Sequence, residues 1–269
     1  MSPGAVAGSL GALALATLLP MGTARAEVDW DVSATGRPAA TELVGDGLFL
    51  GGLQPAGANH AAGSATALSG YDGARRTPFF SAVADVKLLS WLALRGGATY
   101  NPNDNTGDDR SRLRPSVALR AQLLDQARFG ADVSVAAGYR QERFAEDGGL
   151  LDLTAAVGRR FGRLALLGNV GAAADPEGDD FEGQLSLAAL VRTTASLTLG
   201  VQGFYRRDLG STDPRRGIRN GETYDFSAGP MIAYAYQSWM FSVQGGVVGV
   251  RASDSSVGAM GLAAVGAAF

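Results

Sequence analysis

The chain of 269 residues contains no cysteine, a single lysine (Lys87) and a single histidine (His60). The lack of cysteine excludes disulfide bonds, thiolate metal sites and cysteine nucleophiles. No run of about eighteen or more consecutive apolar residues occurs after residue 26, so no helix there is expected to span a membrane. The 23 Lys and Arg against 26 Asp and Glu give a net charge of −3, which argues against nucleic acid as a partner.

The first 26 residues have the pattern of a secretory signal peptide. An apolar run from Leu10 to Leu19 is followed by the small-residue site Ala24-Arg25-Ala26, and this order is typical of a cleaved leader. The segment before the run has no Lys or Arg, and a retained anchor is the alternative. We expect an exported protein whose mature chain begins at residue 27.

Apolar and polar residues then alternate with a period of two. In residues 129–140 the odd positions are Phe, Ala, Val, Val, Ala and Tyr, whereas the even positions are Gly, Asp, Ser, Ala, Gly and Arg. Residues 113–123 and 181–192 alternate in the same way, as strands between two different environments do. Strands are expected near 41–53, 78–88, 91–100, 113–124, 128–140, 150–160, 163–173, 181–192, 196–207, 222–236, 239–250 and 257–269.

The connections between these strands alternate in length. Short connections are expected near 89–90, 125–127, 161–162, 193–195 and 237–238. Long polar segments are expected at 54–77, 101–112, 141–149, 174–180, 208–221 and 251–256. Short turns at one end and longer loops at the other are typical of barrels that cross a bacterial outer membrane.

Aromatic residues lie at the expected strand ends, and the last strand ends on Phe269. Phe129 and Tyr139 are ten residues apart on one face. In a strand tilted by about 40°, ten residues span about 25 Å along the membrane normal. This is the height of the apolar band between the aromatic girdles of a membrane barrel. Tyr224 and Tyr234 are separated in the same way.

With these features the chain resembles the bacterial outer-membrane β-barrel proteins, from about Glu42 to Phe269. The resemblance implies an all-β fold, an antiparallel up-and-down transmembrane barrel of about twelve strands in the outer membrane. It also implies that Phe269 is a signal for the barrel-assembly machinery. The expected organisation is a signal peptide at 1–26, a periplasmic segment at 27–40 and the barrel at 41–269.

A secreted soluble β-sandwich or lipocalin-like barrel is the alternative fold, because its strands alternate too. Such a protein should carry polar turns at both ends of its sheets. Here the charged residues concentrate in every second connection and the apolar faces run the whole length of the strands, which favours the membrane barrel.

Catalytic and metal sites are not expected. His60 lies among Gly, Ala and Ser in the segment 54–77, and no HExxH, GxSxG or P-loop motif occurs. The segments DPEGDD and NPNDNTGDD offer oxygen ligands suited to Ca²⁺ or Mg²⁺. Neither matches an EF-hand, since Thr106 and Arg112 replace the turn glycine and the bidentate Glu. We therefore expect no enzyme and no cofactor.

The polar faces of the strands supply charges that are expected to line the inside of the barrel. These lumen residues are Asp85, Lys87, Arg95, Arg114, Arg120, Asp132, Arg140, Asp152, Glu182, Arg192, Arg206 and Asp225. The cations outnumber the anions, so a conducting pore should slightly favour anions.

Three-residue turns centred on Ser90, Gln126 and Thr194 would fix the pairing of three hairpins. They place Asp85 beside Arg95, Asp132 beside Arg120 and Glu182 beside Arg206. Residues directly opposite on neighbouring strands have Cβ atoms about 4.5–5.5 Å apart. The six side chains are therefore predicted to form ion pairs that narrow the pore.

A cluster of arginines near one long loop suggests contact with lipid phosphate, because guanidinium groups suit phosphate oxygens. The residues concerned are Arg207, Arg215, Arg216 and Arg219. Outer-membrane lipids and lipopolysaccharide are the expected partners. An ordinary charged loop, paired with its own Asp and Glu residues, is the alternative.

Two functions are compatible with this pattern. The first is a narrow channel or transporter for small hydrophilic solutes, because about twelve strands enclose more space than eight and less than sixteen. The second is a closed structural or surface-binding barrel that contacts lipopolysaccharide or an external partner. The sequence identifies neither the solute nor the oligomeric state.

Overall fold

The structure is a computed structural model. It describes residues 63–74, 76–100, 113–140, 149–176, 181–209, 224–251 and 255–269. The predicted signal peptide, the segment 27–40, the strand near 41–53 and His60 lie outside these residues. In the part of the chain that is described, no helix is both long and apolar enough to cross a membrane.

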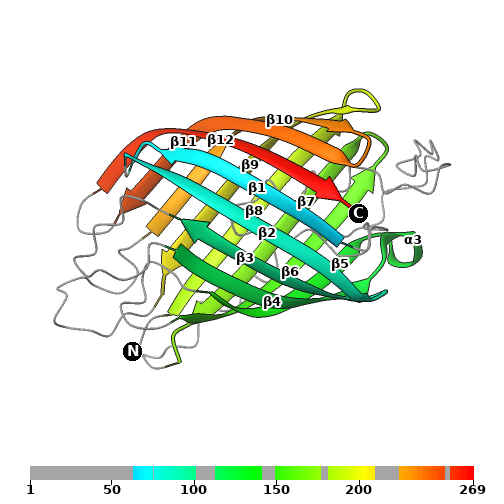
Figure 1. The fold of residues 1–269 in the computed structure, drawn as a ribbon, viewed down its shortest axis with the longest axis horizontal. Coiled ribbons are helices and arrows are strands. Elements are labelled where there is room, and N and C mark those ends of the chain that lie inside the picture. Colours follow the sequence, from blue (N-terminus) through cyan, green and yellow to red (C-terminus); the bar gives the residue numbers. More distant parts are fainter. Residues whose placement is uncertain are drawn as a thin grey trace, which may run out of the picture.

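The described residues form twelve antiparallel strands that close into one barrel, as predicted (Figure 1). Each strand pairs with its neighbours in the chain, and β1 pairs with β12 to close the ring. The strands are β1 (Gly63–Asp72), β2 (Thr77–Leu89), β3 (Leu92–Tyr100), β4 (Leu113–Leu124), β5 (Asp132–Arg140), β6 (Leu150–Phe161), β7 (Leu164–Ala174), β8 (Phe181–Arg192), β9 (Leu197–Asp208), β10 (Tyr224–Tyr236), β11 (Trp239–Arg251) and β12 (Ser255–Ala268).

The two ends of the barrel differ. The short connections between β2 and β3, β4 and β5, β6 and β7, β8 and β9, and β10 and β11 lie at one end, together with Gly63 and Phe269. We call this the turn end and the opposite one the loop end. Figure 1 shows the C-terminal end of β12 on the same side as α3 (Gln126–Phe129), the helical turn that joins β4 to β5.

The first strand is not where the sequence pattern placed it. The predicted loop over 54–77 is wrong at Gly63–Asp72, which forms β1 between β12 and β2. The outward residues of β1 include Ala65, Ala67 and Ser69, so its two faces differ little in hydrophobicity and alternation is weak. The connection from β1 to β2 is also short, which breaks the predicted alternation of long and short connections.

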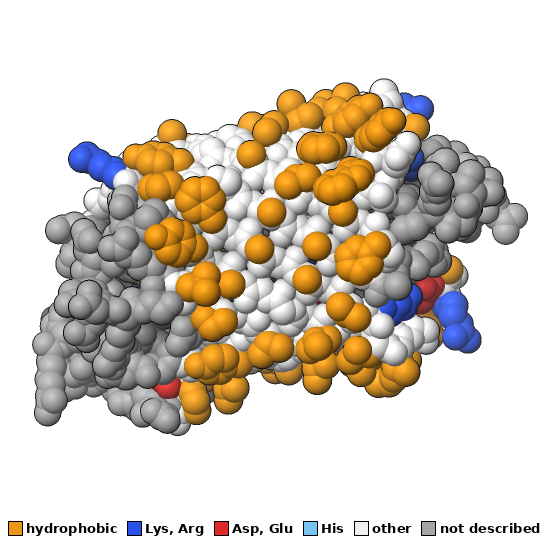
Figure 2. Space-filling model, in the orientation of Figure 1, with side chains coloured by type: hydrophobic (Ala, Val, Ile, Leu, Met, Phe, Trp, Pro, Cys, Tyr) orange, Lys and Arg blue, Asp and Glu red, His pale blue; other side chains and the backbone are white. Residues whose placement is uncertain are grey.

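The outward face of the barrel is apolar. Large hydrophobic side chains from all around the wall are exposed, among them Leu119, Leu153, Leu187 and Val243. In Figure 2 hydrophobic side chains are spread over the wall, and charged ones appear only towards its ends. A soluble protein rarely exposes so continuous an apolar surface, whereas a membrane barrel requires one. The soluble alternative does not fit this surface.

The connection between β4 and β5 differs from the three-residue turn expected at 125–127. It contains α3, whose N-cap is Asp125, with the carboxylate accepting a hydrogen bond from the Ala127 N–H at 2.8 Å. Gly130 ends the helical turn in a left-handed conformation with φ of 79°, which glycine adopts without strain. The added residues, with an irregularity between Gln122 and Leu124, change the register of the two strands.

The last residue takes part in closing the barrel. Phe269 and Gly63 exchange two backbone hydrogen bonds of 2.9 Å each. A Cβ atom at position 63 would stand 2.7 Å from the Phe269 ring, so the ring lies over this glycine. Phe269 therefore extends the β1–β12 pairing to the rim of the turn end.

Deleting Phe269 is expected to lower the amount of assembled barrel sharply. The deletion removes both backbone hydrogen bonds at the seam and the terminal ring predicted to act as an assembly signal. The measurement is the heat-modifiable fraction of the protein in outer-membrane preparations, with Phe269→Tyr as the control that keeps ring and backbone. Equal amounts of heat-modifiable protein from the deletion variant and from the intact protein would contradict this expectation.

Candidate functional site

The inside of the barrel, its lumen, carries the charged residues of the strands. Alternation turns every second side chain inward, and Asp85, Arg120, Glu182, Arg206 and Asp225 are buried. Their contacts reach strands that are not neighbours, as from β5 to β8, which is possible only across the interior. The lumen is therefore the candidate functional site.

A first ion-pair cluster lies in the half of the barrel nearer the turn end. Asp85 on β2 lies directly opposite Arg95 on β3, so the predicted register of this hairpin is confirmed. The Arg95 guanidinium binds the Asp85 carboxylate at 2.8 Å, and that of Arg120 on β4 binds it at 2.9 Å. The Arg120 side chain is only 3% exposed. One carboxylate thus holds two guanidiniums from the next two strands.

The predicted pairing of Arg120 with Asp132 is wrong. Arg120 lies opposite Ala136, four residues along β5, because α3 and the irregularity in β4 lengthen the connection. Asp132 instead accepts a hydrogen bond of 2.8 Å from the backbone N–H of Gln126. Both residues remain on the inward face because the shift is an even number of residues.

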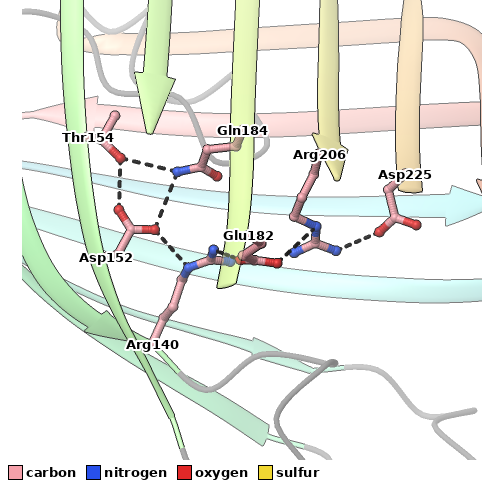
Figure 3. A network of polar contacts seen from close by, with 7 residues as sticks. All are labelled: Arg140, Asp152, Thr154, Glu182, Gln184, Arg206 and Asp225. Atoms are coloured by element: carbon pink, nitrogen blue, oxygen red, sulfur yellow. Dashed lines mark hydrogen bonds and ion pairs between the residues drawn. The ribbon is translucent and has the colours of Figure 1, made fainter. Parts of the chain in front are cut away.

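A second and larger network lies towards the loop end (Figure 3). It joins β5, β6, β8, β9 and β10 through side chains alone. Its members are Arg140, Asp152, Thr154, Glu182, Gln184, Arg206 and Asp225.

Two arginines connect the members of this network. Arg140 binds Asp152 on the adjacent strand at 2.9 Å and also Glu182 on β8, across β6 and β7. Arg206 lies 2.6 Å from Asp225 and 3.8 Å from Glu182. Figure 3 shows Glu182 between the two guanidiniums, with Arg206 reaching on to Asp225. Glu182 is thus the carboxylate that joins the two halves of the network.

The predicted register of the β8–β9 hairpin is wrong by two residues. Glu182 lies opposite Asp208, whereas Arg206 lies opposite Gln184. The last pair is Arg192 opposite Thr198, which leaves five residues between them instead of the expected three. Within this turn the Thr194 hydroxyl accepts hydrogen bonds from the N–H groups of Ser196 and Leu197. The predicted ion pair nevertheless exists, because Arg206 reaches Glu182 diagonally.

The remaining predicted lumen charges take part in none of the ion pairs described above. Arg192 is buried and donates a hydrogen bond of 3.1 Å to the carbonyl of Ala195 in the next turn. Arg114 is half-buried, and Lys87 is exposed near the turn end. Among the residues whose side chains are described, two further charges on the inward faces were not predicted, Asp72 and Arg160. Asp72 lies in the strand that was predicted as a loop, and Arg160 lies on the same face of β6 as the predicted lumen residue Asp152.

The charged residues occupy only part of the lumen wall. Among the described residues, the inward faces of β11 and β12 carry no charged side chain. Towards the loop end Val248, Met260 and Leu262 pack together there, with Leu68 and Phe79 beside them. A second apolar cluster lies nearer the turn end and contains Ala165, Ala188, Leu190, Met231, Ala233, Met240 and Ala268. The lumen thus combines charged regions with two apolar ones.

The sequence of the chain matches no protein-family model and no curated protein. Solved structures are similar in fold. The NanC porin superposes with a TM-score of 0.53 at 9% identity, over 76% of this chain and 98% of NanC. The KdgM porin superposes with a TM-score of 0.51 at 12% identity, over 77% of this chain and 99% of KdgM.

The chain shares the porin fold. This agrees with the predicted resemblance to the bacterial outer-membrane β-barrel proteins and with the predicted outer-membrane location. At such low identity the likeness concerns the fold, and residue roles have to be argued from this chain itself.

The predicted acidic ligands lie mostly outside the described residues. Asp104, Asp108, Asp109, Glu177, Asp179 and Asp180 are in this group, and of the acidic residues in the two segments only Asp175 is described. Within the described ranges no group of three or more His, Asp or Glu side chains is placed to hold a metal ion. Charge pairing in the lumen is the chemistry that the described residues offer.

Replacing Glu182 with Gln is expected to lower the free energy of unfolding by about 3 kcal/mol, because the buried Arg206 and the partly buried Arg140 lose a shared carboxylate. Urea unfolding of the purified barrel in lipid vesicles measures this difference. The control Lys87→Gln removes one charge at an exposed position and should change the value by less than about 1 kcal/mol. Equal changes in the free energy of unfolding for both variants would show that the network contributes little to the stability of the barrel.

Proposed function

We propose that this protein is a narrow outer-membrane channel for small hydrophilic solutes. The observation that carries this proposal is the charged wall of the lumen. It extends from the Asp85 cluster near the turn end to the Glu182 network near the loop end, inside a barrel that is apolar outside. A polar path with an apolar exterior is the arrangement of water-filled membrane barrels.

The size of the barrel limits what can pass. Barrels of eight strands are filled by their own side chains, and those of sixteen or more leave a wide aqueous channel. Twelve strands lie between these cases. Ion pairs that cross the interior further reduce the open cross-section of the lumen. The permeant species are therefore ions and small polar molecules. The likeness to porins supports the fold on which this depends.

The charge balance of the lumen favours anions. The predicted inward cations outnumber the predicted inward anions, and Arg160 and Asp72 add one charge of each sign. The Asp85 cluster holds two guanidiniums on one carboxylate, which makes it the cationic part of the path. A KdgM porin structure contains a disordered oligogalacturonate, so a barrel of this fold accommodates a hydrophilic solute.

A closed structural or surface-binding barrel is the second candidate. It is favoured by side chains that span the interior, such as the Arg140–Glu182 ion pair and the Gln202–Gln244 hydrogen bond between β9 and β11. It is also favoured by the apolar cluster around Met240, whose side chain is fully buried. In both candidates the chain inserts through the barrel-assembly machinery, contacts outer-membrane lipids and performs no catalysis.

Conductance of the purified protein in a planar bilayer distinguishes the two candidates. A channel should give discrete conductance steps with a modest preference for anions. Absence of conductance from folded, heat-modifiable protein would favour the closed barrel instead.

In the conducting protein, Arg120→Ala is expected to shift the selectivity towards cations, because Asp85 then faces one guanidinium in place of two. Reversal potentials in a salt gradient measure the shift. Arg159→Ala is the matched control, since Arg159 is on the outward alternation of β6, where its guanidinium lies 4.7 Å from the centre of the Phe161 ring. Equal selectivity of both variants would place Arg120 off the conduction path.

A further inference from the structure

The rim of the barrel at the turn end carries several arginines around α3. In the described strands no Asp or Glu falls on the outward alternation, whereas Arg159, near the end of β6, does. Arg128 of α3 and Arg163 of the β6–β7 turn are exposed at the same end. Figure 2 shows Lys and Arg side chains at the end of the barrel where Figure 1 places α3. This part of the rim is therefore cationic.

One side chain fixes α3 against the end of β6. The Gln126 side-chain amide donates a hydrogen bond of 3.0 Å to the carbonyl of Arg160, and its oxygen accepts one of 2.9 Å from the Arg160 N–H. A neighbouring strand would make the same two bonds, so the side chain continues the β5–β6 ladder beyond its last pair at Asp132. Arg128, two residues after Gln126, is therefore held beside the strand that carries Arg159.

Two of the three guanidiniums lie over aromatic rings. That of Arg159 is 4.7 Å from the centre of the Phe161 ring, and that of Arg128 is 6.0 Å from the centre of the Phe129 ring. Because Phe161 is two residues nearer the strand end, the Arg159 side chain extends towards the rim. Both rings are exposed, and aromatic residues at the end of a lipid-facing wall lie at the level of the lipid headgroups. The guanidiniums are consequently placed where headgroups, rather than acyl chains, meet the protein.

The described carboxylates do not compensate these charges. In the part of the chain that is described, the ion pairs join other arginines, and none of these three takes part in one. Asp125, which is nearest in sequence to Arg128, accepts a hydrogen bond from the Ala127 N–H as the N-cap of α3. Asp132 is buried on the lumen side and accepts one from the Gln126 N–H.

We propose that Arg128, Arg159 and Arg163 form a binding site for an anionic phospholipid of the periplasmic leaflet. The short turns of outer-membrane barrels face the periplasm, and phospholipids form that leaflet. Planar guanidinium groups match phosphate oxygens with two parallel hydrogen bonds. The exposed rings of Phe129 and Phe161 provide an apolar surface for the first part of the acyl chains. The site is on the outside of the barrel and does not depend on conduction through the lumen.

This site differs from the contact with lipid phosphate that was predicted from the sequence. Of the predicted residues, Arg207 lies near the loop end of β9, and Arg215, Arg216 and Arg219 lie outside the described residues. That prediction used arginines close together in the sequence. The arginines at the turn end come from α3, β6 and the turn after β6, so only the fold brings them together.

The probes are phosphatidylglycerol and phosphatidylcholine with the same acyl chains. Native mass spectrometry of the detergent-purified protein measures the binding of each lipid. The intact protein should bind phosphatidylglycerol more tightly, because only this lipid has a net negative charge. Arg159→Gln should weaken the binding of phosphatidylglycerol about fivefold, the contribution of one basic residue near an anionic membrane surface. The triple variant Arg128→Gln/Arg159→Gln/Arg163→Gln should lose the preference between the two lipids.

Arg76→Gln is the matched control, because it removes an exposed arginine at the loop end and should leave the binding of both lipids unchanged. Heat modifiability establishes that each variant is folded. The corresponding triple lysine variant retains the charges and should keep most of the preference. Equal binding of phosphatidylglycerol by the triple glutamine variant and the intact protein would overturn the proposal, as would equal binding of the two lipids by the intact protein. Displacement of the bound lipid by millimolar glycerol phosphate would identify a site for free anions and overturn the assignment to lipid.

Discussion

The structure depends on one requirement, that every backbone N–H and C=O group in the wall finds a partner inside the wall. In hydrocarbon there is no water to satisfy these groups, so a sheet can span a membrane only when it has no edge. The β1–β12 pairing removes the edge here, from Ser64 opposite Ala268 to Asp72 opposite Met260. Because the ring is closed, each strand has one face outside the barrel and one face inside it. The alternation of apolar and polar residues in the sequence follows from this division.

The same division explains the ion pairs of the lumen. Inward charges cannot be screened fully in a narrow barrel, and a buried charge without a partner is strongly destabilising. Here the carboxylates Asp85 and Glu182 each hold guanidiniums from two other strands. Such contacts stabilise one arrangement of strands over others, while the charges that they bring together make the path polar. In the proposed channel, the stability of the barrel and its selectivity therefore depend on the same side chains.

The faces of the strands could be predicted from the sequence, but the partners of individual residues could not. Residues added to a turn slide two strands past one another, and a slide by an even number, as in both of these hairpins, leaves every side chain on its face. Arg120 therefore points inward as expected, although it lies opposite Ala136 instead of Asp132. The local hydrogen bonds that lengthen these turns, around Asp125 and Thr194, leave no trace in the hydrophobic pattern. β1 was not predicted for a related reason. Residues as small as Ala65 and Ala67 differ little in hydrophobicity from the polar residues on the other face of the strand.

Arg206 and Arg207 show how closely the two environments meet along one strand. They are adjacent in sequence and of the same type, yet Arg206 binds Asp225 in the lumen whereas Arg207 is on the outward alternation next to the stacked ring of Tyr224. Near the middle of the bilayer such a neighbour would be costly, because arginine on the lipid face there destabilises a barrel by about 2–4 kcal/mol. At the loop end the cost falls towards zero, so the strand can end with a charge on each face. The position of a residue along the strand thus decides which residue types each face tolerates. At the end of the strand, two adjacent residues of the same type can face the lumen and the membrane surface.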